Sequence, residues 1–442
     1  MRLHFLSALK FVSFFGAMLS YSGCIHYSPK PLSHESARAS FEKRSLSSLG
    51  LSGGALSFEK LSRAVLKSHP DVAVARAAAD EAKAALVTAG ARPNPTVSFN
   101  PTRVTPQEAG LSPWVAGFSL DVPVETAGKR ARRLDVAQSS ANAAALHVSD
   151  AAWQVRSKLR KAWIDLFAAE RRAETLRAQL ATQGDTVKAL ETRVSGGESS
   201  RPELMQSRLL MNQTRLLVSG AEKSAAEARA DVAAAMALPV SQITGVKFDF
   251  SAAEKPVGEF SAKKLRAAAF TQRSDILASL ADYATAEATL RLEVAKQYPD
   301  IHLGPGYEFD QGPNKWSLGL SLTLPVFDRN RGPIAEAEAK RESAAAKFHA
   351  LEAKVSGEID RALASYRGAL AKLKTADELV AETKKQHDSA EALLKGGEGD
   401  RLAVLTAQVE RDAAALGHLD AQIEVLQAIA AIEDASQIPL AR

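Results

Sequence analysis

The stretch that decides the fold is "KWSLGLSLTLPVFDRNRG", residues 315–332. Apolar side chains occupy every second position in its first part, and small or polar residues lie between them. A period of two is typical of a β-strand with one apolar and one polar face. The apolar positions are Trp316, Leu318, Leu320, Leu322 and Leu324.

Three other segments alternate in the same way, and Trp114, Phe118 and Leu120 lie on the apolar side of one of them. The sequence therefore predicts strands at about 95–104, 114–124, 300–310 and 315–325. Each is about 9–11 residues long, which suits a tilted strand that crosses a bilayer in a barrel. A small water-soluble sheet with one face on a core is the alternative at this point.

The chain consists of two matched halves. "HPDVAVARAAADEAKAAL" from residue 69 corresponds to "RSDILASLADYATAEATL" from residue 273, and "SGGESSR" at 195–201 to "KGGEGDR" at 395–401. Each half is expected to run helix, two strands, long helix, Gly-rich turn, shorter helix. The expected divisions are a signal peptide at 1–23, a Ser-rich extension at 24–56, a first repeat at 57–240, a linker at 241–260, a second repeat at 261–438 and a tail at 439–442.

The long helices carry a heptad pattern. From Val155 to Val194, and again from Val355 to Leu394, mostly apolar residues recur at alternating steps of four and three. Such a repeat imposes left-handed coiled-coil packing. A helix of roughly 65–70 residues is about 100 Å long. The flanking helices, near 57–92 and 202–237, are about half as long, so two laid end to end would cover one long helix.

The N-terminus has the features of an export signal, with basic residues, an apolar core from Phe11 to Leu19 and small residues before Cys24. Cys24 is the only cysteine, which excludes an internal disulfide. "SYSGC" at 20–24 resembles a bacterial lipobox, although Tyr21 stands where Leu is usual. We expect a lipid on Cys24; ordinary cleavage nearby is the alternative.

Several function classes find no support in the sequence. The net charge of +5 comes from mixed charges along the helices, which indicates solvated faces and no nucleic-acid surface. Nine scattered histidines and one cysteine have no metal-ligand spacing, so no metal site is expected. No acid, base and nucleophile recur with catalytic spacing, and "AGKR" at 127–130 is not a nucleotide loop. We expect no enzyme and no cofactor.

The order of elements, given twice, resembles that of the TolC-like outer membrane factors of Gram-negative efflux systems. The resemblance covers roughly residues 57–438. It is carried by "ARPNP" at 91–95, "FSLDVPVETAGKRARR" at 118–133, "LGLSLTLPVFDRNRGPIAEAEAKRE" at 318–342 and the two Gly-rich turns. "LPVFDRNRGPIAEAEA" and "ETAGKR" look most like the branch that serves heavy-metal efflux.

This resemblance implies a mainly α fold with a membrane β-barrel. In it, three copies contribute four strands each to one 12-stranded barrel above a coiled-coil tunnel through the periplasm. The implied partners are a homotrimer, a periplasmic adaptor, an inner-membrane RND-type pump and outer membrane lipid. The protein would be a passive conduit in the outer membrane. The alternatives are a periplasmic coiled-coil adaptor or scaffold without a pore, and drugs or other organic molecules as cargo.

In such a barrel the apolar strand face would contact lipid, because a row of leucines facing water costs more. Basic groups beyond the strands would mark the inner membrane surface. The expected lipid-facing residues are Trp114, Phe118, Leu120, Trp316, Leu318, Leu320 and Leu322. The expected surface markers are Lys129, Arg130, Arg132, Arg133, Arg329 and Arg331.

The Gly-rich turns end the helical hairpins. Ser200 and Glu203 predict a capping box, and Asp400 is expected to cap the second return helix. The resemblance implies that these tips meet the adaptor or gate the pore. Ala403 and Thr406 stand where some relatives have an acidic pair. The candidate tip residues are Gly197, Glu198, Ser200, Glu203, Gly397, Glu398, Asp400 and Arg401.

Overall fold

The computed structural model of the protein describes residues 27–51, 53–106, 108–251 and 258–440. The expected signal peptide and Cys24 lie outside these residues. The chain divides into two units, 1–44 and 45–442. In the first, α2 (His34–Glu42) begins with a capping box formed by Ser33 and Ser36. The fold that concerns function belongs to the second unit.

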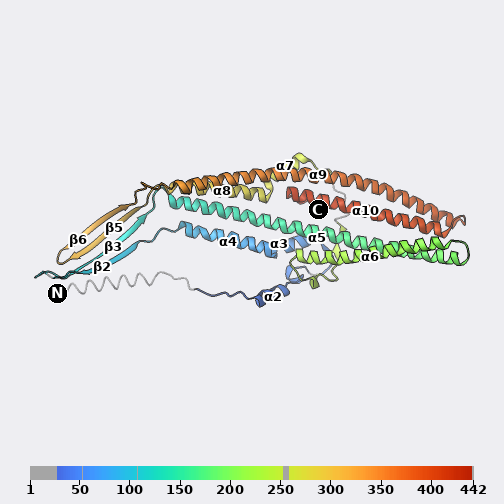
Figure 1. The fold of residues 1–442 in the computed structure, drawn as a ribbon, viewed down its shortest axis with the longest axis horizontal. Helices are drawn as coiled ribbons and strands as arrows, with labels where there is room; N and C mark the ends of the chain where they lie inside the picture. The colour runs from blue at the N-terminus through green and yellow to red at the C-terminus, as the bar shows by residue number, and fades with distance from the viewer. Residues whose placement is uncertain (1–26, 52, 107, 252–257, 441–442) are drawn as a thin grey trace. The chain divides into compact units, whose positions relative to one another are not determined.

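Helices make up most of the second unit (Figure 1), and the two long ones, of 67 and 65 residues, have the length expected from the sequence. The helices are α3 (Phe58–Ser68), α4 (Pro70–Gly90), α5 (Lys129–Ser195), α6 (Arg201–Ala235), α7 (Ala262–Gln272), α8 (Ser274–Ala295), α9 (Arg331–Lys395) and α10 (Arg401–Ser436). The principal strands are β2 (Thr96–Arg103), β3 (Trp114–Val124), β5 (Ile301–Asp310) and β6 (Asn314–Leu322).

The four strands form one antiparallel sheet in the order β2-β3-β5-β6 (Figure 1). The two hairpins come from different halves of the chain, and β3 pairs with β5 between them. Strands β2 and β6 each have one partner strand. The sheet therefore has two open edges, one from each half.

The register places like residues on the same face of all four strands. Phe99 pairs with Phe118, Phe118 with Tyr307, and Tyr307 with Trp316. Because paired residues point to the same side of a sheet, this row is apolar from edge to edge. The other face carries Ser98, Ser119, Gly306 and Ser317 in the adjacent row.

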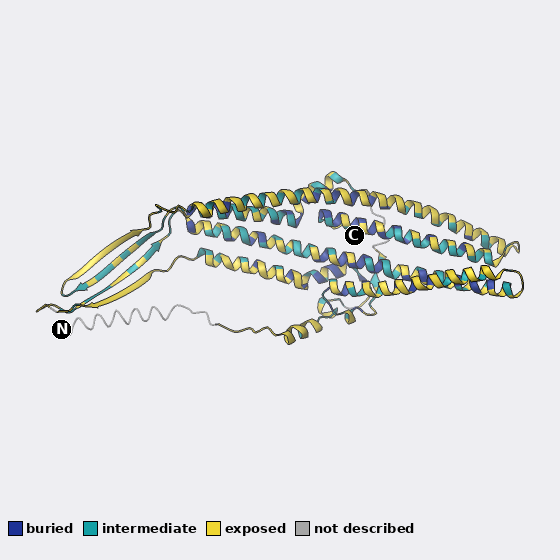
Figure 2. Cartoon of the chain, viewed as in Figure 1, coloured by how far each residue is buried: buried dark blue, intermediate teal, exposed yellow. Residues whose placement is uncertain are grey.

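The predicted coiled-coil seam is confirmed in α5 and in the first part of α9. Val155, Leu159 and Leu166 are almost completely buried, and so are Val355 and Ile359. Along α9 the burial declines towards the hairpin turn, and Leu394 is 38% exposed. Figure 2 shows the same trend, with the buried parts of α5 and α9 away from the turns. Within one chain, the helical hairpin of α9 and α10 is thus less buried near its turn than the hairpin of α5 and α6.

The prediction of one helix near 57–92 is wrong, because the chain forms α3 and α4 with a break at His69. His69 has an extended backbone, the conformation favoured before proline, and its Nδ1 accepts a hydrogen bond from the Asp71 amide. The matching break at Arg273 lacks a proline. There the guanidinium bonds to Asp275 and to the carbonyl oxygen of Ala435, which fixes the chain by tertiary contacts.

Two smaller differences concern strands. The fourth strand ends at Leu322, before the predicted residue 325, so Leu324 is not part of it. Pro325 has no amide hydrogen for a ladder bond, which favours an early end. A short parallel pair, β1 (Leu56–Ser57) and β4 (Phe248–Asp249), was not predicted. It joins the start of the first repeat to the expected linker.

Helix α10 is attached to α5 by a buried ion cluster. Glu433 is completely buried, and its carboxylate lies 3.1 Å from Arg160 Nε and 3.4 Å from Arg156 Nη1. The same carboxylate accepts a hydrogen bond from the Leu440 amide at 2.5 Å. Burial lowers the pKa of Arg160, with Glu433 acting in the opposite direction. Two buried cations thus share one buried carboxylate.

Candidate functional site: a two-faced sheet and a charged hairpin tip

The apolar face of the sheet is exposed to a degree unusual for large side chains. Trp316, Leu318 and Leu320 on the edge strand are 78%, 77% and 72% exposed, and Phe118 on the neighbouring hairpin is 47% exposed. In Figure 2 the edge strands β2 and β6 are coloured as exposed along their length. An apolar patch of this extent marks contact with protein or lipid. The expected face residues thus lie together, Leu120 being partly covered.

Aromatic rings reinforce the apolar face across three strands. The ring centroids of Phe118 and Tyr307 are 5.5 Å apart, and those of Tyr307 and Trp316 are 4.9 Å apart. Arg103 lies over Trp114, 5.9 Å from the ring centroid. These contacts favour the observed register, because cross-strand aromatic pairs stabilise a sheet.

The opposite face of the sheet carries glycines and polar side chains. Gly117 allows close approach, since a Cβ there would lie 2.9 Å from the Tyr307 carbonyl oxygen. His302 Nδ1 lies 3.1 Å from the Asp121 carboxylate, and Lys315 Nζ lies 2.5 Å from Asp310. The face thus has small and paired polar groups, which suit contact with water.

At the other end of the long helices, both hairpin turns use the same backbone design. Gly197 and Gly397 adopt left-handed conformations with φ of 78° and 79°. The amide of Glu198 donates to the Arg193 carbonyl, and that of Glu398 donates to the Leu393 carbonyl. This is the helix ending that requires glycine, because a side chain is strained at positive φ. Both predicted turns are therefore confirmed as turns.

The caps of the return helices are formed largely as predicted. Ser200 Oγ accepts a hydrogen bond from the Glu203 amide at 3.4 Å, and Asp400 Oδ1 accepts one from the Leu402 amide at 3.1 Å. The return bond of a capping box, from Glu203 to Ser200, is absent among the described residues. The box is therefore only half formed.

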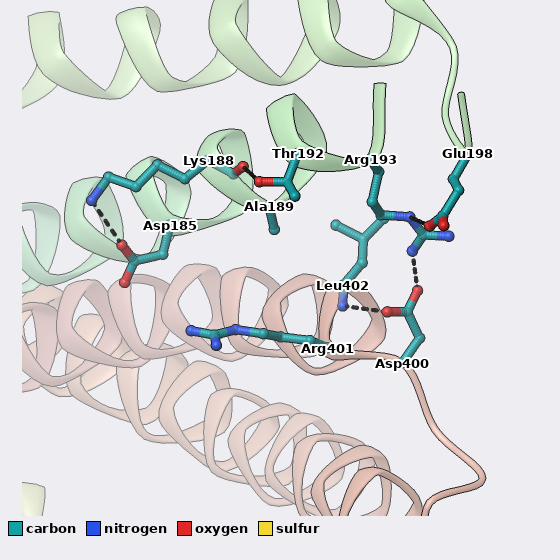
Figure 3. A pocket seen from close by; sticks show the side chains of 9 residues that line it. All are labelled: Asp185, Lys188, Ala189, Thr192, Arg193, Glu198, Asp400, Arg401 and Leu402. Atoms are coloured by element: carbon teal, nitrogen blue, oxygen red, sulfur yellow. Dashed lines mark hydrogen bonds and ion pairs between the residues drawn. The ribbon is translucent and has the colours of Figure 1, made fainter. Parts of the chain in front are cut away.

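The two turns are joined by an ion pair between Arg193 and Asp400 (Figure 3). Glu198 lies 3.9 Å from the Arg193 guanidinium. An open groove of about 510 Å³ lies beside this pair. Its lining residues are Asp185, Lys188, Ala189, Thr192, Arg193, Glu198, Asp400, Arg401 and Leu402.

Of the predicted tip residues, the groove brings Glu198, Asp400 and Arg401 together, and the others lie in the turns or first helical turns. Sequence reasoning missed Arg193. The available signal was a basic residue in the last turn of α5, which also interacts favourably with the helix dipole.

The Leu402 amide and the Arg193 guanidinium lower the pKa of the Asp400 carboxyl. A carboxyl with a lowered pKa stabilises the folded state above its unfolded pKa of about 3.9. That stabilisation disappears only as the pH falls through the lower folded value. The ion pair between the turns is therefore present throughout the neutral and mildly acidic range.

The basic residues expected at the first strand–helix junction make contacts within the chain. Lys129 is buried and its Nζ lies 2.8 Å from Asp300, which joins the first repeat to the second. Arg130 donates to the Gly90 carbonyl and Arg133 to the Ala91 carbonyl, where α4 ends. These side chains thus have structural roles at the junction, and their expected place at the inner membrane surface stays a prediction.

Two further features are absent from the described residues. No group of three or more His, Cys, Asp or Glu side chains among them is arranged to hold a metal ion. No helix in the described part of the chain is both long and apolar enough to cross a membrane.

An exposed two-faced sheet joined to very long paired helices defines the mainly α, TolC-like fold. The outer membrane efflux protein family model matches residues 61–238 and 265–436, which include both repeats. The chain therefore belongs to the outer membrane efflux protein family.

Individual relatives are distant in sequence. The cobalt-zinc-cadmium resistance protein CzcC of Cupriavidus metallidurans is 22% identical over 289 residues, which cover 64% of this chain and 66% of that protein. The chain thus spans slightly less than two thirds of this relative. The crystal structure of the outer membrane protein VceC from Vibrio cholerae has a TM-score of 0.69 at 20% identity, covering 86% of this chain and 95% of that one. A crystal structure of CusC has a TM-score of 0.67 at 16% identity, covering 88% and 95%.

Proposed function

We propose that the protein is the outer membrane channel of a tripartite efflux system and acts as a passive conduit. The observation that carries this proposal is the sheet. One of its faces is exposed and apolar from edge to edge, and the other carries small and polar residues. Lipid on one side and water on the other satisfy both faces. Family membership and the TolC-like fold support the same function.

Association of several copies follows from the open edges of the sheet. Unpaired edge groups are not tolerated in lipid, so β6 of one copy must pair with β2 of the next. Four strands are too few for a ring, because the smallest membrane barrels have about eight. Three copies with twelve strands agree with the proposed family architecture. A coiled-coil scaffold without a pore would leave the apolar face unexplained.

We infer that the hairpin tips form the end that meets the periplasmic adaptor, with an inner-membrane RND-type pump behind it. The groove beside Arg193 and Asp400 is open, charged and formed by both hairpins. The Arg193–Asp400 pair keeps the two turns together within one copy. Opening the tip would require this pair to separate or to exchange partners.

Substitution of Arg193 by glutamine is expected to raise the single-channel conductance in planar bilayers by about twofold or more, because the joined turns then separate more easily. Arg208→Gln is the matched control, since Arg208 lies on α6 and pairs with Glu191 within the same hairpin. The control should keep the conductance of the unmodified protein. Equal conductance in all three proteins would exclude the pair as a restraint on the tip.

For the cargo, we propose heavy-metal cations, on the basis of the match with CzcC. A conduit benefits from weak wall contacts, so a tight metal site is not required for this cargo. Deleting the gene should lower resistance to cobalt, zinc and cadmium in growth assays, and a plasmid copy should restore it. Sensitivity to organic drugs alone, with metal resistance unchanged, would overturn the metal assignment and favour the alternative cargo.

We also propose a lipid on Cys24, which lies outside the described residues. Metabolic labelling with radioactive fatty acid should mark the unmodified protein, whereas Cys24→Ser should carry no label, because no other cysteine is present. Equal labelling of the two proteins would exclude the anchor. The channel itself does not depend on this result.

A further inference from the structure

The segment between β6 and α9, residues 323–330, exposes three large apolar side chains. Leu324 and Val326 are 66% and 64% exposed, and Phe327 is fully exposed at 101%. We call this segment the β6–α9 junction. It continues directly from the apolar edge strand, whose Leu322 is also exposed. Water contact at these positions is unfavourable, so another apolar phase or surface is expected to cover them.

The corresponding junction of the first repeat is built differently. Only residues 125–128 separate β3 from α5, and their polar groups are used internally. Thr126 bonds to Asp300 and to the carbonyl of Pro299, and Glu125 pairs with Arg133. The chain can thus connect a strand to a long helix without exposing a large apolar side chain between them. The longer, apolar β6–α9 junction is therefore not required by the connection alone.

Two cations follow the apolar side chains. Arg329 and Arg331 are exposed, and neither has an ion pair among the residues that the structure describes. Asp328 accepts a hydrogen bond from the Asn330 amide, and Asn330 donates to the Glu293 carbonyl at 2.7 Å, which fixes the start of α9. The first amides of α9 add partial positive charge at the same place.

Ring closure would add a third cation. Strand β6 ends, and strand β2 begins, at the helical end of the antiparallel sheet. Pairing β6 with β2 of the next copy therefore brings Arg92 of that copy beside the β6–α9 junction. Arg92 is exposed and has no ion pair among the described residues. Three neighbouring arginines repel one another, which disfavours a contact made of protein alone. Together they can bind a phosphate group, whose negative charge removes this repulsion.

We propose that the β6–α9 junction binds anionic phospholipid in the inner leaflet of the membrane. Leu324, Val326 and Phe327 enter the acyl-chain boundary, and the arginines contact the lipid phosphate. This inference rests on the proposed trimeric channel, because the third arginine comes from the neighbouring copy. Basic groups beside an apolar anchor are the usual means of holding anionic headgroups.

Native mass spectrometry of the detergent-extracted, full-length protein tests the proposal. Phosphatidylglycerol should bind more tightly than phosphatidylcholine. The double variant Arg329→Gln/Arg331→Gln should lower the affinity for phosphatidylglycerol by about 25-fold, because each basic residue contributes roughly fivefold. Arg208→Gln/Arg215→Gln removes the same charge from exposed positions on α6 and should leave the lipid preference unchanged. Inorganic phosphate should not displace the lipid at equal concentration, because it has no acyl chains.

The same spectra separate two kinds of failure. A monomer would contradict the proposed channel, whereas a trimer in which the double variant keeps its phosphatidylglycerol preference would overturn only the lipid site. Phe327→Trp provides a second readout, since an exposed position tolerates the larger ring. The chain has four tryptophans of its own, so the signal is the difference between the variant and the unmodified protein. Brominated phosphatidylglycerol should quench this added fluorescence more than brominated phosphatidylcholine does. A blue-shifted, unquenched tryptophan would mean that another protein copy covers the junction, which would also overturn the proposal.

Discussion

Leu318→Arg is expected to abolish most of the membrane-inserted oligomer. Leu318 lies near the middle of β6, on the apolar face, and is 77% exposed. A charged residue at the lipid face near the bilayer midplane costs about 2–4 kcal/mol. A trimer incurs this cost in each copy. Unboiled gel electrophoresis of the membrane fraction should therefore show little or no oligomer.

Ser317→Arg is the matched control for this substitution. It introduces the same side chain one residue earlier, on the polar face, where water is available. The oligomer should persist, with a narrower pore. Equal loss of oligomer in both variants would contradict the assignment of the two faces, and loss only in Ser317→Arg would reverse it.

Glu433→Ala is expected to destabilise the helical part of the protein by about 3–5 kcal/mol, the cost of leaving buried charge unpaired. The carboxylate is completely buried between Arg156 and Arg160, so its removal leaves two guanidiniums without their shared counterion. The unfolding temperature, followed by circular dichroism on the full-length protein, should fall by several degrees or more.

Glu424→Ala serves as the control for the buried cluster. Glu424 lies on the same helix and pairs with Lys372 at 2.5 Å, but both side chains are about half exposed. Exposed pairs contribute about 0–1 kcal/mol, so the change in unfolding temperature should be small. If the two variants behave alike, Glu433 does not hold α10 to α5 in the way the structure indicates.

The features that sequence predicts well are those with a period. The alternation around Leu318 defined both faces of β6, and the steps of four and three located the buried side of α5. The Gly-rich turns could also be predicted, since Gly197 and Gly397 adopt backbone conformations that favour glycine. In each case neighbouring residues of the chain determine the local structure.

Features that depend on distant residues were missed. Arg273 breaks a helix through its bond to the Ala435 carbonyl, more than 160 residues away. Arg193 looks like an ordinary basic residue at a helix end until Asp400 is placed beside it. Glu433 looks like a solvated helix residue, because its partners Arg156 and Arg160 lie on α5. A single sequence holds no local sign of such pairings.

Electron cryo-microscopy of the full-length protein, extracted from membranes in mild detergent, tests the central claim most directly. We expect three copies, with β6 of each hydrogen-bonded to β2 of the next in a closed ring of twelve strands. The apolar row through Phe118 and Trp316 should face the detergent. A single copy whose sheet edges stay unpaired, or whose apolar face is covered by its own helices, would contradict the proposed channel.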